Sequence, residues 1–206
     1  MKKIIPFVIT ALLLVGCSNS LNEHQLQVEQ NIKSKYCMKR PQNAKVDTCI
    51  IHCTESNDPL EMCVNNMRLE GVSYHYVIAK DGKWKEMVPA DYIAYHAGAS
   101  IMPHPDNRHN VNEFSVGIGL MGKVNGTPFT DEQYLSASRI CTELEKKYGP
   151  LHYLGHSDVA GKRVWEYGLR EDIKNDPGKN FKWSKFYKYL SYFSRTENNS
   201  VGKVNK

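Results

Sequence analysis

The chain has 206 residues, of which 41% are hydrophobic, so it can build an ordinary core and global disorder is excluded. Its formal net charge is +5, and two of the positive charges belong to Lys2 and Lys3, in a segment that we expect to be removed. The remaining charge of about +3 suits an anionic polymer or a membrane surface. It is too small and too scattered to indicate a nucleic-acid partner.

The N-terminus has the pattern of a secretory signal peptide. A basic start is followed by an apolar run at residues 4–15, which is too short to span a bilayer as a mature helix. The ending Leu14-Val15-Gly16-Cys17 resembles a bacterial lipobox, in which the cysteine is acylated and becomes the new N-terminus. The alternative is a signal peptide that happens to contain a cysteine.

We therefore expect residues 1–16 to be a lipoprotein signal peptide and Cys17 to be lipidated. Several acyl chains on one cysteine anchor a protein firmly to a membrane. Ser18, rather than Asp, follows the cysteine. By resemblance to lipoproteins of two-membrane bacteria, this favours the outer membrane, with the protein facing the periplasm.

Five further cysteines remain for the exported chain, namely Cys37, Cys49, Cys53, Cys63 and Cys141. Export permits disulfide bonds, and an odd count leaves at least one thiol unpaired or paired between molecules. The sequence leaves the pairing open. It contains no Cys-x-x-Cys pair, so a zinc site made of thiolates is not supported.

The first half of the chain predicts a tether followed by three strands and a helix. Residues 17–45 are polar and predict a tether, with one helical stretch at residues 21–33. A strand is expected at residues 46–54, and then a helix to about residue 69 with Asp58 as its N-terminal cap. Strands at residues 71–78 and 84–88 flank a hairpin turn.

The second half predicts two more strands and two helices. A long loop holds His104 and His109, which could form a second metal site but are better explained as solvated histidines. The pattern then predicts a strand at 114–121, a helix from a capping box at Thr130 to about Gly149, a strand at 151–156, a helix at 183–193 and a polar tail at 194–206. The fold class is α/β: a single domain, residues 46–193, with a mixed β-sheet flanked by helices.

Three residues near predicted strand ends could bind one metal ion. His52 and His156 each end a predicted strand, and Asp176 follows in a loop. If the two strands are neighbours, both imidazoles emerge at one edge of the sheet. Three such ligands with an open fourth position form a catalytic zinc site, in which the pKa of a bound water falls to roughly 7.

Lys174, two residues before Asp176, could stabilise an oxyanion at such a site. Each candidate also has an ordinary explanation. A histidine at a strand end is commonly hydrogen-bonded or on the surface, the sequence Asp-Pro-Gly is commonly a turn, and Lys174 could be a solvated lysine.

Six motifs recur in order and carry a family resemblance, which covers roughly residues 45–190. They are Ile50-Ile51-His52-Cys53-Thr54, Val72-Ser73-Tyr74-His75-Tyr76-Val77-Ile78, Tyr95-His96-Ala97-Gly98, Ser115-Val116-Gly117-Ile118, Gly155-His156-Ser157-Asp158 and Lys174-Asn175-Asp176-Pro177-Gly178. Together they resemble the zinc-dependent N-acetylmuramoyl-L-alanine amidases. This family includes AmpD-like enzymes, phage lysozyme-amidases and peptidoglycan recognition proteins.

The resemblance implies a recognition-protein-like amidase fold and a Zn2+ cofactor. By position, His52, His156 and Asp176 match the zinc ligands, and Lys174 matches the lysine that stabilises the transition state. His96 matches the His-Ala-Gly motif that lines the substrate groove.

The chain departs from the AmpD-like pattern at two positions. Gly119 stands where those members have a glutamate, and Tyr74 stands where they often have a small residue. Phage amidases and catalytic recognition proteins resemble this chain at both positions. We therefore expect the Tyr74 phenol to take over part of the glutamate's catalytic role.

Other features remain open at this stage. The segment 158–173 is longer than the shortest family loops; it could shape the groove or be a surface insertion packed by Trp165. Recognition proteins have a disulfide bond near this part of the fold. The resemblance therefore suggests that Cys53 and Cys63 could be bonded, which would link the first strand to the helix after it.

The implied function is hydrolysis of the amide between N-acetylmuramic acid and L-alanine of the stem peptide. The expected partners are peptidoglycan or muropeptides and, through the lipid anchor, the membrane, and the protein is expected to be a monomer. The alternative is a non-catalytic peptidoglycan- or muropeptide-binding lipoprotein, and an amidase toxin or its inhibitor also stays open.

Overall fold

A five-stranded mixed sheet forms the centre of the domain. The computed structural model describes residues 36–41 and 43–201. The strand order is β4-β3-β6-β2-β7, with β4 antiparallel to β3 and the other neighbours parallel. The strands are β2 (Thr48–Cys53), β3 (Tyr76–Ile78), β4 (Trp84–Glu86), β6 (Ser115–Leu120) and β7 (His152–Gly155). The predicted mixed sheet flanked by helices is confirmed.

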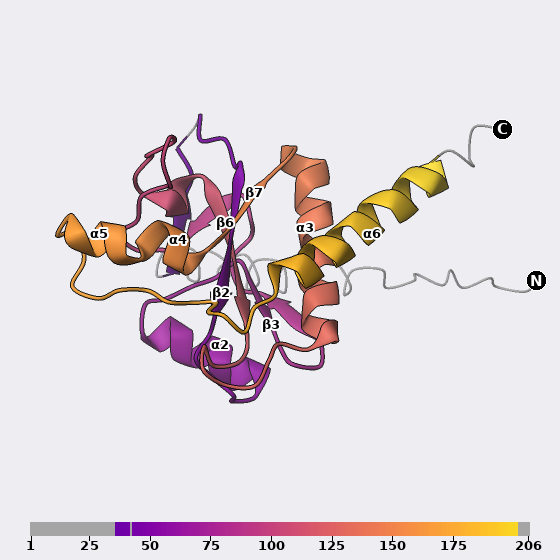
Figure 1. Ribbon diagram of the computed structural model, residues 1–206, viewed down its shortest axis with the longest axis horizontal. Helices are drawn as coiled ribbons and strands as arrows, with labels where there is room; N and C mark the ends of the chain where they lie inside the picture. The colour runs from indigo at the N-terminus through magenta and orange to yellow at the C-terminus, as the bar shows by residue number, and fades with distance from the viewer. Residues whose placement is uncertain (1–35, 42, 202–206) are drawn as a thin grey trace, which may run out of the picture. The chain divides into compact units, whose positions relative to one another are not determined.

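Two long helices cover one face of this sheet. α3 (Asp131–Tyr148) and α6 (Trp183–Val201) pack against each other on this side (Figure 1). From β2, Cys49, Ile51 and Cys53 point into the same apolar cluster as the buried side chains of both helices. The predicted capping box at Thr130 is confirmed: Thr130 Oγ1 accepts from the Gln133 N–H, and the Gln133 side chain accepts from the Thr130 N–H.

The other face is covered by short helices and loops. α4 (His156–Ala160) and α5 (Lys162–Glu166) lie here, together with the 3-10 helix η1 (Val111–Glu113), whereas α2 (Leu60–Leu69) contacts β3. Ile50 of β2 packs into this layer beside Ala97 and Val159. Because strand side chains alternate, His52 faces the same layer as Ile50, away from α3. The sequence pattern of β2 therefore decides on which side its histidine is presented.

The folded unit begins earlier than the sequence predicts. β1 (Cys37–Lys39) pairs antiparallel with β5 (Tyr92–Ala94), although residues 17–45 were expected to be a tether. Arg40 is only 9% exposed, and its guanidinium donates to four backbone carbonyls. These belong to Ala90, Asn112, Glu113 and Ser115. Tyr36 is the first residue of the compact unit, while Cys17 and the helical stretch predicted at residues 21–33 lie outside the described residues.

Several element boundaries also differ from the prediction. β3 is shorter than residues 71–78, because the Ser73 N–H donates to the Tyr95 carbonyl instead of continuing the sheet. Asp58 does not cap α2, since its carboxylate accepts from the Ser56 hydroxyl and Pro59 occupies the cap position. α6 continues to Val201, beyond the end predicted at residue 193.

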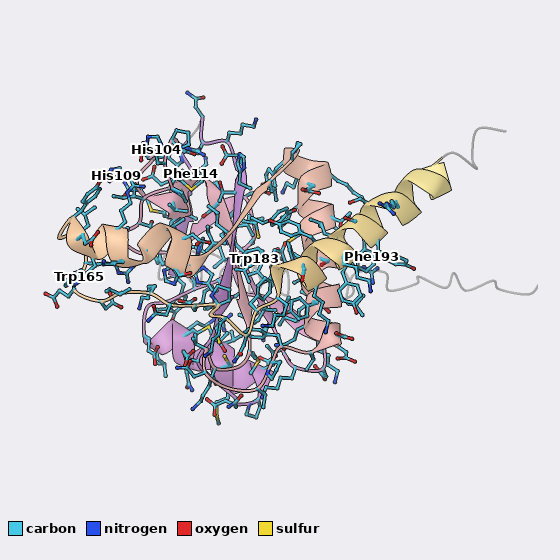
Figure 2. The ribbon with its side chains drawn as sticks, viewed as in Figure 1. His104, His109, Phe114, Trp165, Trp183 and Phe193 are labelled. Carbon is cyan, nitrogen blue, oxygen red and sulfur yellow. The ribbon has the colours of Figure 1, made fainter. Side chains whose placement is uncertain are left out.

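The segment 158–173, predicted as a loop, begins within α4 and includes α5. Trp165 of α5 is 46% exposed (Figure 2), whereas its neighbour Val164 is buried. The five cysteines of the described region are buried, and Cys49, Cys53, Cys63 and Cys141 are free thiols, so Cys53 and Cys63 are not bonded to each other. Within the residues that the structure describes, none of the helices is both long and apolar enough to cross a membrane.

Candidate metal centre

His52, His156 and Asp176 meet at the carboxyl edge of the sheet. β2 and β7 are adjacent parallel strands in which Ile51 pairs with Gly155, so the next residue of each strand places an imidazole at this edge. The Asp176 carboxylate lies 3.2 Å from His52 Nδ1 and 3.0 Å from His156 Nδ1. One ligand atom from each of the three residues lies within 4.8 Å of the others. The structure thus brings together the three residues predicted to be metal ligands.

The cluster is almost fully buried, with exposures of 0% for His52, 6% for His156 and 8% for Asp176. Burial, and secondarily the neighbouring His156, lowers the pKa of His52 to about 4, so this imidazole is neutral at physiological pH. Burial by itself would raise the pKa of Asp176, but the imidazoles of His156 and His52 outweigh it and hold this pKa well below its ordinary value. The site therefore offers a neutral imidazole at His52 and a carboxylate at Asp176.

This donor set fits a zinc ion. Two imidazole nitrogens and one carboxylate oxygen are ligands that zinc accepts in catalytic sites, where a fourth position stays open. Among residues 36–41 and 43–201, this is the one group of three or more potential ligands close enough to share an ion. His104 and His109 are exposed and do not belong to it; both lie in the loop region near Phe114 (Figure 2). The interpretation of these two as solvated histidines agrees with this placement.

A groove of about 570 Å3 opens onto the cluster. Its walls include the ligands His156 and Asp176, together with Glu55, Glu70, Tyr74, Asn125, Asp172 and Lys174. The Lys174 ammonium lies 2.6 Å from the Asp172 carboxylate. Lys174 and then Arg170 lower the pKa of Asp172 to about 2, so the ion pair persists over the physiological range. A cationic side chain therefore stands in the groove next to the candidate ligands.

Tyr74 and Gly119 form one packing unit beside His52. The Tyr74 ring centroid is 4.8 Å from that of His52. A Cβ added at Gly119 would lie 2.9 Å from Tyr74 Cδ2, closer than packed carbon atoms approach. Gly119 is therefore the residue that makes room for the Tyr74 ring. Burial, and next the Asp176 charge, raises the pKa of Tyr74, so the phenol keeps its proton.

His96, expected from the resemblance to line the substrate groove, is a buried residue that contacts His52. It is not among the residues that line the groove of about 570 Å3. Its Nδ1 is 3.0 Å from His52 Nε2, and its Nε2 is 3.3 Å from Ser115 Oγ. The ring fits there because a Cβ at Gly117 would be 2.4 Å from His96 Cγ. Burial, followed by the three neighbouring histidines, lowers the pKa of His96 well below its ordinary value.

Sequence reasoning missed the residues that hold His96 and its neighbour Ala97. The Asn112 side-chain oxygen accepts from both of their backbone N–H groups, at 3.3 and 2.8 Å. The sequence did carry a signal for the buried position of the His96 ring. It is the alternation Ser115-x-Gly117-x-Gly119, which leaves only small side chains on one face of β6. In a strand buried on both faces, such a row indicates that other groups occupy the space above it.

Comparison with known proteins agrees with this geometry. The family model described as N-acetylmuramoyl-L-alanine amidase matches residues 42–179. The chain belongs to this amidase family. Its curated relatives include the 1,6-anhydro-N-acetylmuramyl-L-alanine amidases AmpD of Enterobacter cloacae, at 36% identity, and of Haemophilus influenzae, at 33%. These alignments cover 59% and 56% of this chain, but only 58% and 56% of the relatives' lengths.

Solved amidase structures share the fold. The selenomethionine derivative of AmpD superposes with a TM-score of 0.61 at 25% identity, covering 75% of this chain and 90% of that one. The Escherichia coli amidase AmiD, solved with anhydro-N-acetylmuramic acid-L-Ala-D-gamma-Glu-L-Lys, gives a TM-score of 0.59 at 21% identity. That alignment covers 73% of this chain and 60% of AmiD. The likeness to AmiD is one of fold.

The contact between Tyr74 and Gly119 predicts a strong coupling between substitutions at these two positions. Gly119→Ala should lower the free energy of unfolding by about 1–3 kcal/mol, because the new methyl group overpacks the Tyr74 ring. The same substitution in a Tyr74→Ala background should cost much less, since the ring is gone. Urea denaturation of the four proteins in this double-mutant cycle measures the coupling. Equal costs in both backgrounds would contradict the steric argument.

Proposed function

We propose that this protein is a peptidoglycan amidase that hydrolyses the amide between N-acetylmuramic acid and L-alanine of the stem peptide. The observation that carries the proposal is the buried cluster of His52, His156 and Asp176, open to a groove, in a chain of the amidase family. A groove alone would serve a binding protein equally well. The complete set of three ligands favours a hydrolase.

Zinc is the proposed cofactor, held by His52, His156 and Asp176. When bound, zinc lowers the pKa of a water molecule and polarises a carbonyl group. The protein contributes a site that is already assembled and largely shielded from water, since His52, His156 and Asp176 are all buried residues. In such a site, electrostatic interactions with the scissile amide are stronger than in water.

Lys174 is the proposed stabiliser of the negative charge that develops on the amide oxygen. It lines the same groove as His156 and Asp176, and its side chain is 36% exposed, so its ammonium can meet a substrate. In the structure this ammonium is paired with Asp172. Asp172 also lines the groove, so a bound substrate carbonyl would compete with this carboxylate for the Lys174 ammonium or share it.

Tyr74 is proposed to act as a hydrogen-bond donor. Its raised pKa keeps the phenol protonated, which excludes it as a general base at neutral pH. The ring lies against His52 and occupies the space above Gly119, where AmpD-like members carry their glutamate. The phenol can therefore orient a water molecule or the substrate carbonyl, while the proton from the attacking water must pass to another group.

The proposed substrates are muropeptides or peptidoglycan strands carrying a stem peptide. The relatives named above are 1,6-anhydro-N-acetylmuramyl-L-alanine amidases, and AmiD was solved with an anhydro-muropeptide. We further propose that Cys17 carries lipid and that the monomeric domain works in the periplasm, attached to the outer membrane. The lipobox-like sequence and the serine at position 18 support this location.

The amidase proposal predicts metal-dependent release of stem peptides. We expect the protein to cleave defined muropeptides, with and without a 1,6-anhydro end, and the free stem peptide to be detected by mass spectrometry. A chelator should abolish the reaction and added zinc should restore it. His156→Ala should lower kcat/KM by more than about 10³-fold, because the metal loses one of three ligands. His152→Ala is the matched control, because it removes an exposed histidine from β7, the strand that leads into His156.

Tight binding of the muropeptide by the zinc-loaded protein without turnover would instead support the binding-module alternative.

The donor role of Tyr74 predicts that Tyr74→Phe lowers kcat by about 10- to 100-fold with little change in KM, because only the hydroxyl is lost. The experiment requires equal zinc content and an unchanged melting temperature. Tyr76→Phe removes a phenol two residues away that bonds Glu86, and it should leave kcat unchanged. Full activity of Tyr74→Phe would exclude the role.

The lipid anchor predicts that cells expressing the protein incorporate a labelled fatty acid into it and that the protein sediments with outer membranes. Cys17→Ser should abolish both. Labelling that persists in the Cys17→Ser variant would contradict the assignment of this cysteine.

A further inference from the structure

A row of hydrogen bonds runs from the Val111 carbonyl through Ser115 and His96 to His52. In each of these bonds the donor and the acceptor follow from the number of protons that each group carries. The Ser115 hydroxyl donates to the Val111 carbonyl at 2.6 Å. Because this hydroxyl has one proton and a carbonyl can only accept, Ser115 Oγ can only accept from His96 Nε2, which lies 3.3 Å away. His96 therefore carries its proton on Nε2.

The same count continues to the first candidate ligand. In the neutral His96 ring, a proton on Nε2 leaves Nδ1 as an acceptor. His96 Nδ1 lies 3.0 Å from His52 Nε2, so His52 must donate from Nε2. The other nitrogen of His52, Nδ1, is then the one that exchanges a proton for a metal ion. It is also the nitrogen that faces Asp176.

The second imidazole ligand is fixed by the adjacent residue. His156 Nε2 lies 3.2 Å from the carbonyl oxygen of Ala97, which can only accept, so His156 also carries a proton on Nε2. Its Nδ1 faces Asp176 at 3.0 Å. One dipeptide, His96-Ala97, thus contacts both ligands, by a side chain and by a carbonyl.

We propose that His96-Ala97 is the positioning element of the metal centre, and that Ser115 and Asn112 set its chemistry. Ser115 fixes the tautomer of His96, and through it His52 presents Nδ1 to the metal. Asn112 holds the dipeptide in place by accepting both of its backbone N–H groups. The inference rests on the proposed zinc site, and it assigns to His96 a role in metal binding instead of substrate contact.

The packing around the dipeptide supports this role. Gly117 leaves space for the His96 ring, and Arg170 donates to the carbonyls of Ala97 and Ala99. The ring is thus confined by the strand beneath it and by His52 above it. A ligand whose second nitrogen is held by a fixed acceptor binds metal more strongly than one that must be reoriented.

Zinc affinity of the purified chain, measured by competition with a chromophoric chelator, tests the proposal without any substrate. Ser115→Ala should weaken zinc binding by about 10-fold or more, because His96 is then free to move its proton to Nδ1 and oppose His52. Ser138→Ala removes an equally buried serine that bonds the Phe186 carbonyl on the other face of the sheet, and it should leave the affinity unchanged. An affinity for Ser115→Ala within twofold of the wild type would overturn the proposal.

If Ser115→Ala does not fold, the zinc affinities of two variants of Asn112 test the positioning role of the dipeptide. Asn112→Ala should weaken zinc binding, whereas Asn112→Asp keeps the accepting oxygen and should retain it. Equal losses in both variants would contradict the positioning role of Asn112.

The tautomers can be observed directly by nitrogen NMR of 15N-histidine-labelled protein. We expect His96 to be protonated at Nε2 and unprotonated at Nδ1 in the wild type, with or without zinc. A proton on His96 Nδ1 would overturn the inference even if the protein is an active amidase. Conversely, the expected tautomers and tight zinc binding without muropeptide hydrolysis would refute the proposed function alone.

Discussion

The parallel pairing of β2 with β7 is the constraint on which the rest of the site depends. It brings two histidines from distant parts of the chain to the same edge of the sheet, because His52 and His156 directly follow the paired residues Ile51 and Gly155. Two buried imidazoles and a carboxylate together would be costly if they served no ligand, because each loses hydration on burial. The cluster lies at the end of β2, a strand that is buried along its whole length, so packing of the core keeps the three side chains in place.

The face of β6 that looks toward the site explains how so many rings fit there. Ser115, Gly117 and Gly119 lie on this one face of the strand. Ser115 is hydrogen-bonded to His96, Gly117 leaves space for the His96 ring, and Gly119 leaves space for the Tyr74 ring. The absence of a side chain at position 119 is therefore the counterpart of a tyrosine at position 74. The two departures from the AmpD-like pattern are therefore linked, because the Tyr74 ring occupies the space that a side chain at position 119 would need.

Sequence reasoning predicted the parts of this molecule that depend on local patterns. The capping box at Thr130 and the two histidines at strand ends follow from the order of residues over short distances, and the structure places them as expected. It failed where a polar group acts over a long distance. Arg40 looks like a tether residue until its four carbonyl acceptors, between 50 and 75 residues away, are known. The motif around His96 likewise gives no sign that the ring is buried in the space left by Gly117.

The early start of the folded unit ties the first strand of the domain to the candidate site. β1 pairs with β5, and Arg40, the residue that follows β1, donates to the backbone carbonyl of Ser115. The hydroxyl of the same Ser115 lies 3.3 Å from His96 Nε2, and His96 in turn contacts His52. A substitution that loosens β1 should therefore disturb the imidazole behind His52, although no residue of β1 lines the groove.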